Sequence, residues 1–205
     1  MTKRIVFLAL LVAVFATACS VNRPPLVRQT YLLQGERKGA PATATGATLR
    51  VGNFSVAPPF EGKGLVYRLD GARYDADFYH EFFVSPRAMV ADGVTRWLQQ
   101  SGMFRNVLAK GVGGDADYLL EGHVSELYAD FRGGGKPAAV MTVQFYLTDK
   151  GGSGDIVFNA DLSRRVEVAD RSAQAVAQAM NTAFSGVLAE LEARLGRAGL
   201  KAGGD

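Results

Sequence analysis

The stretch Ala139–Thr148, AVMTVQFYLT, alternates between two kinds of side chain with the period of a β-strand. One face would carry four apolar side chains, those of Met141, Val143, Phe145 and Leu147. The other face would carry the side chains of Thr142, Gln144, Tyr146 and Thr148. A strand with one apolar and one more polar face is typical of an antiparallel sheet that is buried on one side only.

The segments on either side of this stretch repeat its pattern. Tyr118–Phe131 alternates in part, with Leu120, Gly122 and Val124 on one side. After a glycine-rich turn at Lys150–Asp155, a second alternating run begins at Ile156 and continues with Phe158, Ala160 and Leu162. Three such strands joined by short connections predict an antiparallel meander.

Two helices are predicted to cover the buried face. The first spans Pro86–Gln100, with Ser85 as a cap, Pro86 at the first helical position and Gly102 beyond its end. The second spans Ser172–Leu195, with Glu190 and Arg194 paired on its exposed side. Its apolar stripe consists of Val176, Met180, Ala183, Phe184, Val187, Leu188, Leu191 and Leu195. Further strands are expected at Tyr31–Leu33, Leu49–Val56, Gly64–Leu69 and Phe104–Leu108. The pattern predicts a single layered α/β domain with a largely antiparallel sheet and flanking helices.

The chain begins with the features of an export signal. Lys3 and Arg4 precede an apolar run, Ile5–Phe15, that is too short to span a bilayer. Ala16-Thr17-Ala18-Cys19 then resembles a bacterial lipobox, in which the cysteine is lipidated and becomes the first residue of the mature protein. Cys19 is the only cysteine of the chain, and an unpaired thiol is unusual in an exported protein. The alternative is an ordinary secretory signal with a stray thiol.

These features predict four segments. Residues 1–18 form a lipoprotein signal peptide, and residues 19–30 are the lipidated cysteine with a proline-bearing tether. Residues 31–196 form the folded domain, and residues 197–205 form a flexible tail. Ser20 follows the cysteine at a position where aspartate would favour retention in the inner membrane. Ser20 therefore predicts sorting to the outer membrane, where acyl chains on Cys19, palmitate among them, would hold the domain facing the periplasm.

The composition argues against nucleic acid as a partner. Removing Lys3 and Arg4 with the signal leaves 21 of the 23 basic residues against 20 acidic ones. The remaining charges are scattered and form no basic stripe that could follow a phosphate backbone. The glycine clusters at 111–114, 133–135 and 151–154 lack the lysine and helix of a P-loop, so they are interpreted as turns.

The sequence also argues against an enzyme. His80 and His123 are the only histidines, and neither has the spacing of a metal site. No nucleophile elbow or nucleophile–base pair is present, and Asp70, Asp75 and Asp77 do not form a calcium-binding loop. We therefore expect no catalytic residue, no metal site and no cofactor.

The stretch Leu65–Val107 resembles the ABC-type transport auxiliary lipoproteins, which include the PqiC type. The resemblance rests on Val66-Tyr67-Arg68, Tyr74, the aromatic run that leads to Ser85-Pro86, Trp97-Leu98 and the segment Ser101–Val107. Tyr31-Leu32-Leu33 and the long helix near the end also fit. The resemblance implies a mixed sheet with flanking helices and a non-catalytic lipoprotein. Such a lipoprotein would work with an MCE-domain protein, a permease and an ATPase to move phospholipid or a related lipid across the envelope. It would dock this assembly at the outer membrane, as a homo-oligomeric ring in one arrangement.

A partner surface is expected among the aromatic residues and the arginine of this stretch, because such side chains are enriched at interface cores. The candidates are Tyr67, Arg68, Tyr74, Phe78, Tyr79, Phe82 and Phe83. The alternative is that most of these rings belong to the core. Two other functions stay open: a periplasmic lipid carrier with a pocket beside the helix Ser172–Leu195, and a structural envelope lipoprotein unconnected with transport.

Overall fold

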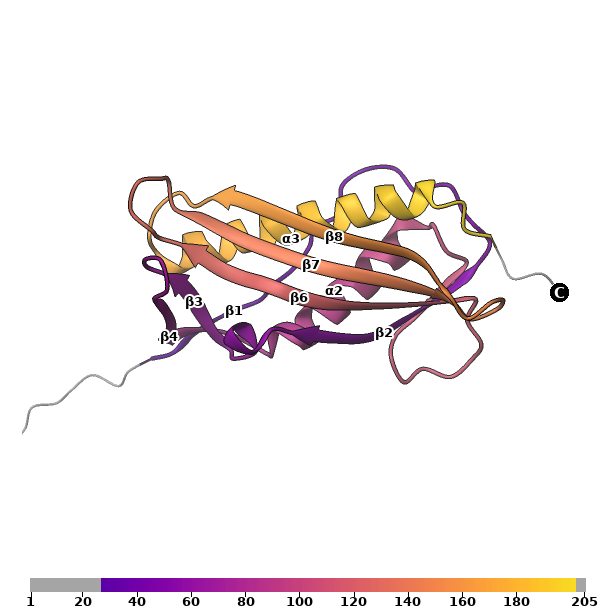
Figure 1. Ribbon diagram of the computed structural model, residues 1–205, viewed down its shortest axis with the longest axis horizontal. Coiled ribbons are helices and arrows are strands. Elements are labelled where there is room, and N and C mark those ends of the chain that lie inside the picture. Colours follow the sequence, from indigo (N-terminus) through magenta and orange to yellow (C-terminus); the bar gives the residue numbers. More distant parts are fainter. Residues whose placement is uncertain (1–26, 202–205) are drawn as a thin grey trace, which may run out of the picture.

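The computed structural model describes residues 27–201, which form one mixed sheet of eight strands with two α-helices on one of its faces (Figure 1). Cys19 and Ser20 lie outside the described residues. The strands are β1 (Gln29–Tyr31), β2 (Thr48–Val56), β3 (Gly64–Arg68), β4 (Tyr74–Phe82), β5 (Asn106–Leu108), β6 (Tyr118–Asp130), β7 (Ala138–Asp149) and β8 (Ile156–Glu167). The helices are α2 (Pro86–Ser101), α3 (Ala173–Arg197) and the short 3-10 helix η2 (Pro58–Phe60).

The predicted antiparallel meander is confirmed as β6, β7 and β8. Phe145 of β7 lies opposite Gly122 of β6 and Ala160 of β8, so the three alternating patterns share one register. Two shorter strands lie along the other edge of β6, both parallel to it. β2 pairs with the first half of β6, and β3 pairs with its last two residues. β5 extends the sheet beyond β2, and β4 and β1 extend it beyond β3, which makes the sheet mixed.

The helices bury the apolar face that the alternation predicted. Met141, Val143, Phe145 and Leu147 are fully buried, and every residue of the predicted stripe of α3 is buried as well. α3 packs over β7 and β8, whereas α2 packs over β2 and β5. The two helices meet at Gly93, where an added Cβ would lie 2.5 Å from Cε1 of Phe184. The missing side chain at Gly93 thus allows the close approach of the helices.

The helix boundaries agree with the prediction to within two residues. Ser172 caps α3 through its side chain, which accepts a hydrogen bond from the Ala175 amide at 3.2 Å. Ser85 occupies the same position before α2 but forms no side-chain cap, so its predicted role is wrong in that respect. Gly102 closes α2 with a φ of 66°, a conformation that glycine adopts without strain. α3 continues to Arg197, two residues beyond the predicted end.

The two ends of the chain differ from the predicted segments. β1 begins at Gln29, so Gln29 and Thr30 belong to the sheet rather than to the tether. At the other end, the Tyr118 hydroxyl donates a hydrogen bond to the Lys201 carbonyl at 3.0 Å. Lys201 of the expected tail thus still contacts the sheet, and residues 202–205 lie outside the described part. No helix within residues 27–201 is long and apolar enough to cross a membrane.

The sheet is long, and its two ends carry different elements. β1, β3 and β4 lie at one end, and the β7–β8 turn and the end of α3 lie at the other (Figure 1). β6 connects the two ends over thirteen residues, a length of about 40 Å. A surface at one end is therefore well separated from a surface at the other.

Candidate functional site

Six polar and aromatic side chains gather where β3, β4 and the end of β6 meet, on the face of the sheet opposite to α2 and α3. They are Arg68, Tyr74, Tyr128, Asp130, Arg132 and Arg165, and we call them the arginine–tyrosine cluster. The ladders place them together, since Arg68 lies opposite Tyr74 and Asp130, while Val140 lies opposite both Tyr128 and Arg165. Their strand positions put them opposite to the face on which Leu127 and Met141 are buried.

Three rings support the aromatic half of the cluster. Tyr74 lies edge-on to Tyr128, with ring centroids 5.6 Å apart, and edge-on to Phe60 of η2 at 6.2 Å. Phe60 stacks on Tyr128 at 5.8 Å and is itself buried. Such edge-to-face and stacked geometries are favoured by the aromatic quadrupole. Tyr74 keeps 40% of its surface exposed, so part of the ring is accessible to solvent although Phe60 and Tyr128 hold it in place.

Arg68 lies between the rings and the charged half of the cluster. Its guanidinium carbon is 5.3 Å from the centroid of Tyr74 and 5.9 Å from that of Tyr128, within the range of a cation–π contact. Nη2 donates to the Gly71 carbonyl at 3.0 Å. Nε is buried and has no hydrogen-bond partner among the described residues. A buried donor without a partner is unusual, and it marks a place where an acceptor from another molecule would be stabilising.

Asp130 holds the other two arginines. Its carboxylate is 4% exposed and accepts hydrogen bonds from Nε and Nη2 of Arg132, at 2.9 and 2.8 Å, and from Nη1 of Arg165 at 2.8 Å. The hydrogen bonds from Arg132, and then from Arg165, lower the pKa of Asp130 far below its usual range despite its burial. Because the cluster contains three arginines and one carboxylate, which binds two of them, it carries a net positive charge.

The structure divides the predicted partner surface into separate parts. Arg68 and Tyr74 belong to the arginine–tyrosine cluster. Tyr67 points to the opposite face, where it stacks on Phe131 at 5.2 Å and its hydroxyl donates to Asp77 at 2.9 Å. Burial and this hydrogen bond raise the pKa of Tyr67. The expectation for Phe82 needs correction, because its side chain is 3% exposed and belongs to the core.

The remaining three predicted residues, Phe78, Tyr79 and Phe83, form what we call the aromatic edge patch. They lie on and just after β4, beside β1 at the margin of the sheet. Phe78 and Phe83 are 62% and 61% exposed, and the rings of Phe78 and Tyr79 meet edge-on at 5.3 Å. Sequence reasoning could not separate them from Phe82, because period-2 alternation breaks down within β4.

A bulge stabilised by Asp77 causes this break. Between Gly64 and Val66 the partner strand advances from Glu81 to Ala76, so β4 contains extra residues there. Oδ1 of Asp77 accepts hydrogen bonds from the amides of Tyr79 and His80, at 2.8 and 3.0 Å. Burial works against the ionised form of Asp77, but these and other hydrogen bonds outweigh it and lower its pKa. Bulges re-aim side chains, and this one lies where Phe78 and Tyr79 turn outward.

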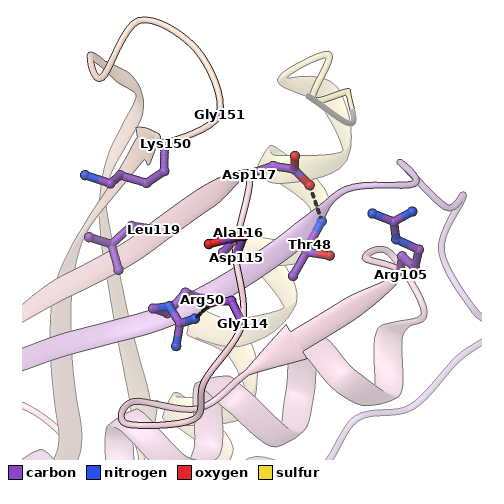
Figure 2. A pocket seen from close by; sticks show the side chains of 10 residues that line it. All are labelled: Thr48, Arg50, Arg105, Gly114, Asp115, Ala116, Asp117, Leu119, Lys150 and Gly151. Carbon is purple, nitrogen blue, oxygen red and sulfur yellow. Dashed lines mark hydrogen bonds between the residues drawn. The ribbon is translucent and has the colours of Figure 1, made fainter. Parts of the chain in front are cut away.

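A polar depression lies at the far end of the sheet, lined in part by Arg50, Arg105, Asp117 and Lys150 (Figure 2). Its volume is about 480 Å³. The Arg50 guanidinium donates to backbone carbonyls of the adjoining loop, and an Asp117 oxygen accepts from the Thr48 amide at 2.6 Å. Figure 2 shows Lys150 and Arg105 on opposite sides of the depression rather than converging. The lining carries both basic and acidic side chains, and its basic side chains do not converge on one point, so the depression indicates no particular class of ligand.

The described residues show no arrangement that suggests metal chemistry. No three side chains of His, Cys, Asp or Glu within residues 27–201 are grouped as metal ligands. Nδ1 of His80 lies 2.8 Å from an oxygen of Asp77, and Nδ1 of His123 lies 2.8 Å from the hydroxyl of Ser55. Each histidine thus has a local hydrogen-bond partner.

Sequence reasoning missed four members of the site: Tyr128, Asp130, Arg132 and Arg165. Asp130 and Phe131 end a predicted strand and Arg132 lies between that strand and a glycine turn, so the pattern did not mark any of them as a site residue. Arg165 lies 35 positions from Asp130, and only the register of β6, β7 and β8 brings them together. One signal was available in Asp130 itself. It stands at the end of a strand with apolar residues at alternate positions, and a carboxylate that becomes buried there needs a charged partner.

The fold and the cluster together define a small two-layer α/β domain that exposes arginine and tyrosine side chains of the kind found in protein contact surfaces. The model of the ABC-type transport auxiliary lipoprotein component matches residues 31–192, and the chain belongs to this family. The resemblance stated from the sequence is thereby confirmed.

Comparisons with solved structures show the same fold. Protein XCC0632 from Xanthomonas campestris is 20% identical, with a TM-score of 0.75 over 83% of this chain and 96% of that chain. A second crystal structure, of an uncharacterized protein, is 13% identical, with a TM-score of 0.64 over 82% and 99% of the two chains. No curated protein matches the chain significantly.

Proposed function

We propose that this protein is the non-catalytic auxiliary lipoprotein of an MCE-type ABC transport system that moves phospholipid or a related lipid across the cell envelope. Membership of the transport auxiliary family supports a role in an ABC transport system. The MCE-domain partner and the lipid cargo extend that role. In this proposal, acyl chains on Cys19 anchor the protein to the outer membrane on its periplasmic side, and Ser20 permits the sorting.

The observation that carries the docking role is the arginine–tyrosine cluster. It combines exposed arginine and tyrosine side chains, which are the residue types that most often dominate binding energy at protein interfaces. The Asp130 carboxylate and the ring contacts of Tyr74 already hold these side chains in place. Little side-chain entropy would therefore be lost when a partner binds.

The chemistry of the cluster favours a partner with acidic and carbonyl groups. The cluster has three guanidinium groups and a single carboxylate, which binds Arg132 and Arg165, and Nε of Arg68 has no acceptor among residues 27–201. A carboxylate or a backbone carbonyl from the MCE-domain protein would satisfy that donor. The exposed edge of Tyr74 would supply apolar contact beside it.

A ring of identical copies is part of the proposal, and β8 is the element that could support it. Among the described strands, β8 pairs only with β7, and beyond the irregularity at its start the ten residues Phe158–Glu167 form an outer edge of the sheet. Exposed strand edges are the usual places where a second chain adds to a sheet. The mass of the purified lipoprotein in detergent, from light scattering, tests this part.

The lipid-carrier alternative finds less support. Phe184, Leu188 and Leu191, the residues considered for an acyl pocket, are fully buried against the sheet. Phe184 lies against Gly93 of α2 and Leu188 against Gly35, as expected of a close-packed core. The stripe on α3 is therefore better explained as core than as the lining of a carrier.

The experiment that tests the proposal is affinity capture with the full-length lipoprotein from a detergent extract of the envelope, identifying both proteins and lipids. The expected result is an MCE-domain protein among the captured chains. The double variant Arg68→Ala/Tyr74→Ala should lose it, whereas Ile156→Ser, an exposed change at the far end of the sheet, should retain it. Capture of lipid without an MCE-domain protein would favour the carrier, and unaltered capture by a folded double variant would refute the docking surface.

A further inference from the structure

The aromatic edge patch stays exposed in the part of the chain that the structure describes, residues 27–201. Phe78 and Phe83 each expose more than three fifths of their surface, and Tyr79 exposes 42%. Val27 and Leu32 of the adjoining chain are also exposed, at 74% and 47%. A group of exposed apolar side chains at one margin of a domain indicates a binding surface for another molecule or for a membrane.

The patch lies where the folded domain is joined to the segment that carries the proposed anchor. Gln29 of β1 pairs with His80, and the Phe83 amide donates to the Tyr31 carbonyl at 2.8 Å, so β1 runs directly beside the patch. The Arg28 guanidinium lies 4.6 Å from the ring centroid of Phe78. The start of the described chain is thus fixed against the patch itself.

The length of chain between the anchor and the patch is short. Arg28 is nine residues after Cys19, and nine residues span at most roughly 30 Å even when fully extended. With acyl chains on Cys19, the patch would stay within that distance of the bilayer surface. Contact with the bilayer would then be an intramolecular event, for which even a weak interfacial affinity is sufficient.

The composition of the patch fits the interface of a bilayer. Aromatic side chains concentrate at the level of lipid headgroups, and basic side chains beside them are attracted to anionic lipids. Arg28 lies over Phe78, and Nζ of Lys63 donates to the Phe83 carbonyl at 3.2 Å. Glu81 is the acidic residue paired with Arg28, at 3.7 Å. Asp77, next to Phe78, is held by hydrogen bonds from Tyr67 and from the amides of Tyr79 and His80, so Lys63 is the charged group of this set that has no ionic partner of opposite sign among the described residues.

We propose that the aromatic edge patch, Phe78, Tyr79 and Phe83, lies in the interfacial region of the membrane that holds the lipid anchor. This inference rests on the lipidation of Cys19 in the proposed function. The bulge at Asp77 is the device that turns Phe78 and Tyr79 outward for this contact. The patch thereby fixes the orientation of the domain, with the β1–β4 margin toward the lipid and the long sheet extending away from it.

The test uses the full-length lipoprotein in vesicles of phosphatidylethanolamine and phosphatidylglycerol that contain a spin-labelled phospholipid. Cys19 is the only native cysteine, so a new cysteine supplies the only thiol free for labelling once Cys19 is acylated. Val84→Cys places an environment-sensitive fluorophore beside the patch. Val157→Cys, which is similarly exposed at the far end of the sheet, is the matched control.

The expected result is strong quenching at position 84 and little at position 157. Phe78→Ser/Phe83→Ser should reduce the quenching at 84 by roughly tenfold, because the double variant loses the burial of two apolar rings that would keep position 84 close to the lipid. Ile156→Ser should leave it unchanged. Thermal unfolding of each variant, followed by circular dichroism, shows whether the domain is intact, and a folded double variant with undiminished quenching overturns the inference.

Flotation of the same vesicles separates this inference from the anchor on which it rests. Protein that floats with the vesicles while position 84 is quenched no more than 157 keeps the lipid anchor and overturns the membrane contact. Protein that does not float overturns both. A signal at 84 that rises with protein concentration instead of with quencher content shows a second copy on this margin, and it also overturns the membrane assignment.

Discussion

Replacing Asp130 by asparagine should weaken both the stability of the domain and the order of its contact surface. The substitution keeps the shape of the side chain but removes its negative charge. The carboxylate accepts three hydrogen bonds of 2.8 to 2.9 Å, two from Arg132 and one from Arg165. Hydrogen bonds to charged groups contribute about 1.5–3 kcal/mol each when buried, but exposed ion pairs contribute about 0–1 kcal/mol. Since Arg132 and Arg165 are 42% and 51% exposed, we expect a total loss of about 2 kcal/mol.

This loss should depend on pH in a defined direction. The pKa of Asp130 lies below its ordinary value of 3.8 in the folded domain, so the unfolded chain binds the proton more tightly. The carboxylate therefore stabilises the fold above that value, and the stabilisation is lost as the pH falls further toward the folded pKa. The gap in stability between the wild type and Asp130→Asn should be full at neutral pH and should shrink below about pH 4.

Urea unfolding at a series of pH values measures this gap. Asp161→Asn makes the same chemical change at an exposed position of β8 and should shift the free energy of unfolding by less than about 0.5 kcal/mol. A loss for Asp130→Asn no larger than that of the control would refute the stabilising role of the carboxylate. A gap that stays constant down to pH 3 would refute the assigned direction of its pKa.

Two further substitutions test the packing and capping of the helices by the same urea assay. Gly93→Ala should destabilise the domain by about 1–3 kcal/mol, because the new methyl group would overlap Phe184. Gly133→Ala, in open space, should change stability by less than about 0.5 kcal/mol. Equal effects of the two substitutions would contradict the close helix contact. Ser172→Ala should cost about 1 kcal/mol through the lost cap, and Ser85→Ala should cost little because Ser85 forms no side-chain cap. A larger effect at Ser85 would contradict this assignment.

The local parts of the fold were predictable from the sequence because their signals are local. Alternation in Ala139–Thr148 identified the face of β7 that is buried, and the stripe of α3 identified its packing surface. Both patterns depend only on side-chain spacing along one element. The meander could be predicted because strands joined by short turns usually pair with each other in antiparallel orientation.

The parallel pairings and the contact surface could not be predicted in the same way. β2 and β3 both lie along one edge of β6, a choice made between segments far apart in the chain. The arginine–tyrosine cluster depends on that choice, since Arg68 meets Asp130 only through the β3–β6 pairing. Likewise, the bulge at Asp77 determines which rings of β4 are exposed, and it could not be predicted because it interrupts the period-2 pattern of the strand.

The most direct test of the docking role is photocrosslinking in living cells from the centre of the arginine–tyrosine cluster. Tyr74→p-benzoylphenylalanine keeps an aromatic ring at the position whose edge is exposed, and Val157→p-benzoylphenylalanine places the same group at the far end of the sheet. We expect a crosslink to an MCE-domain protein from position 74 and none from position 157. No crosslink from position 74 in a folded, membrane-anchored protein, or equal crosslinks from both positions, would contradict the proposal that this cluster docks the transport assembly.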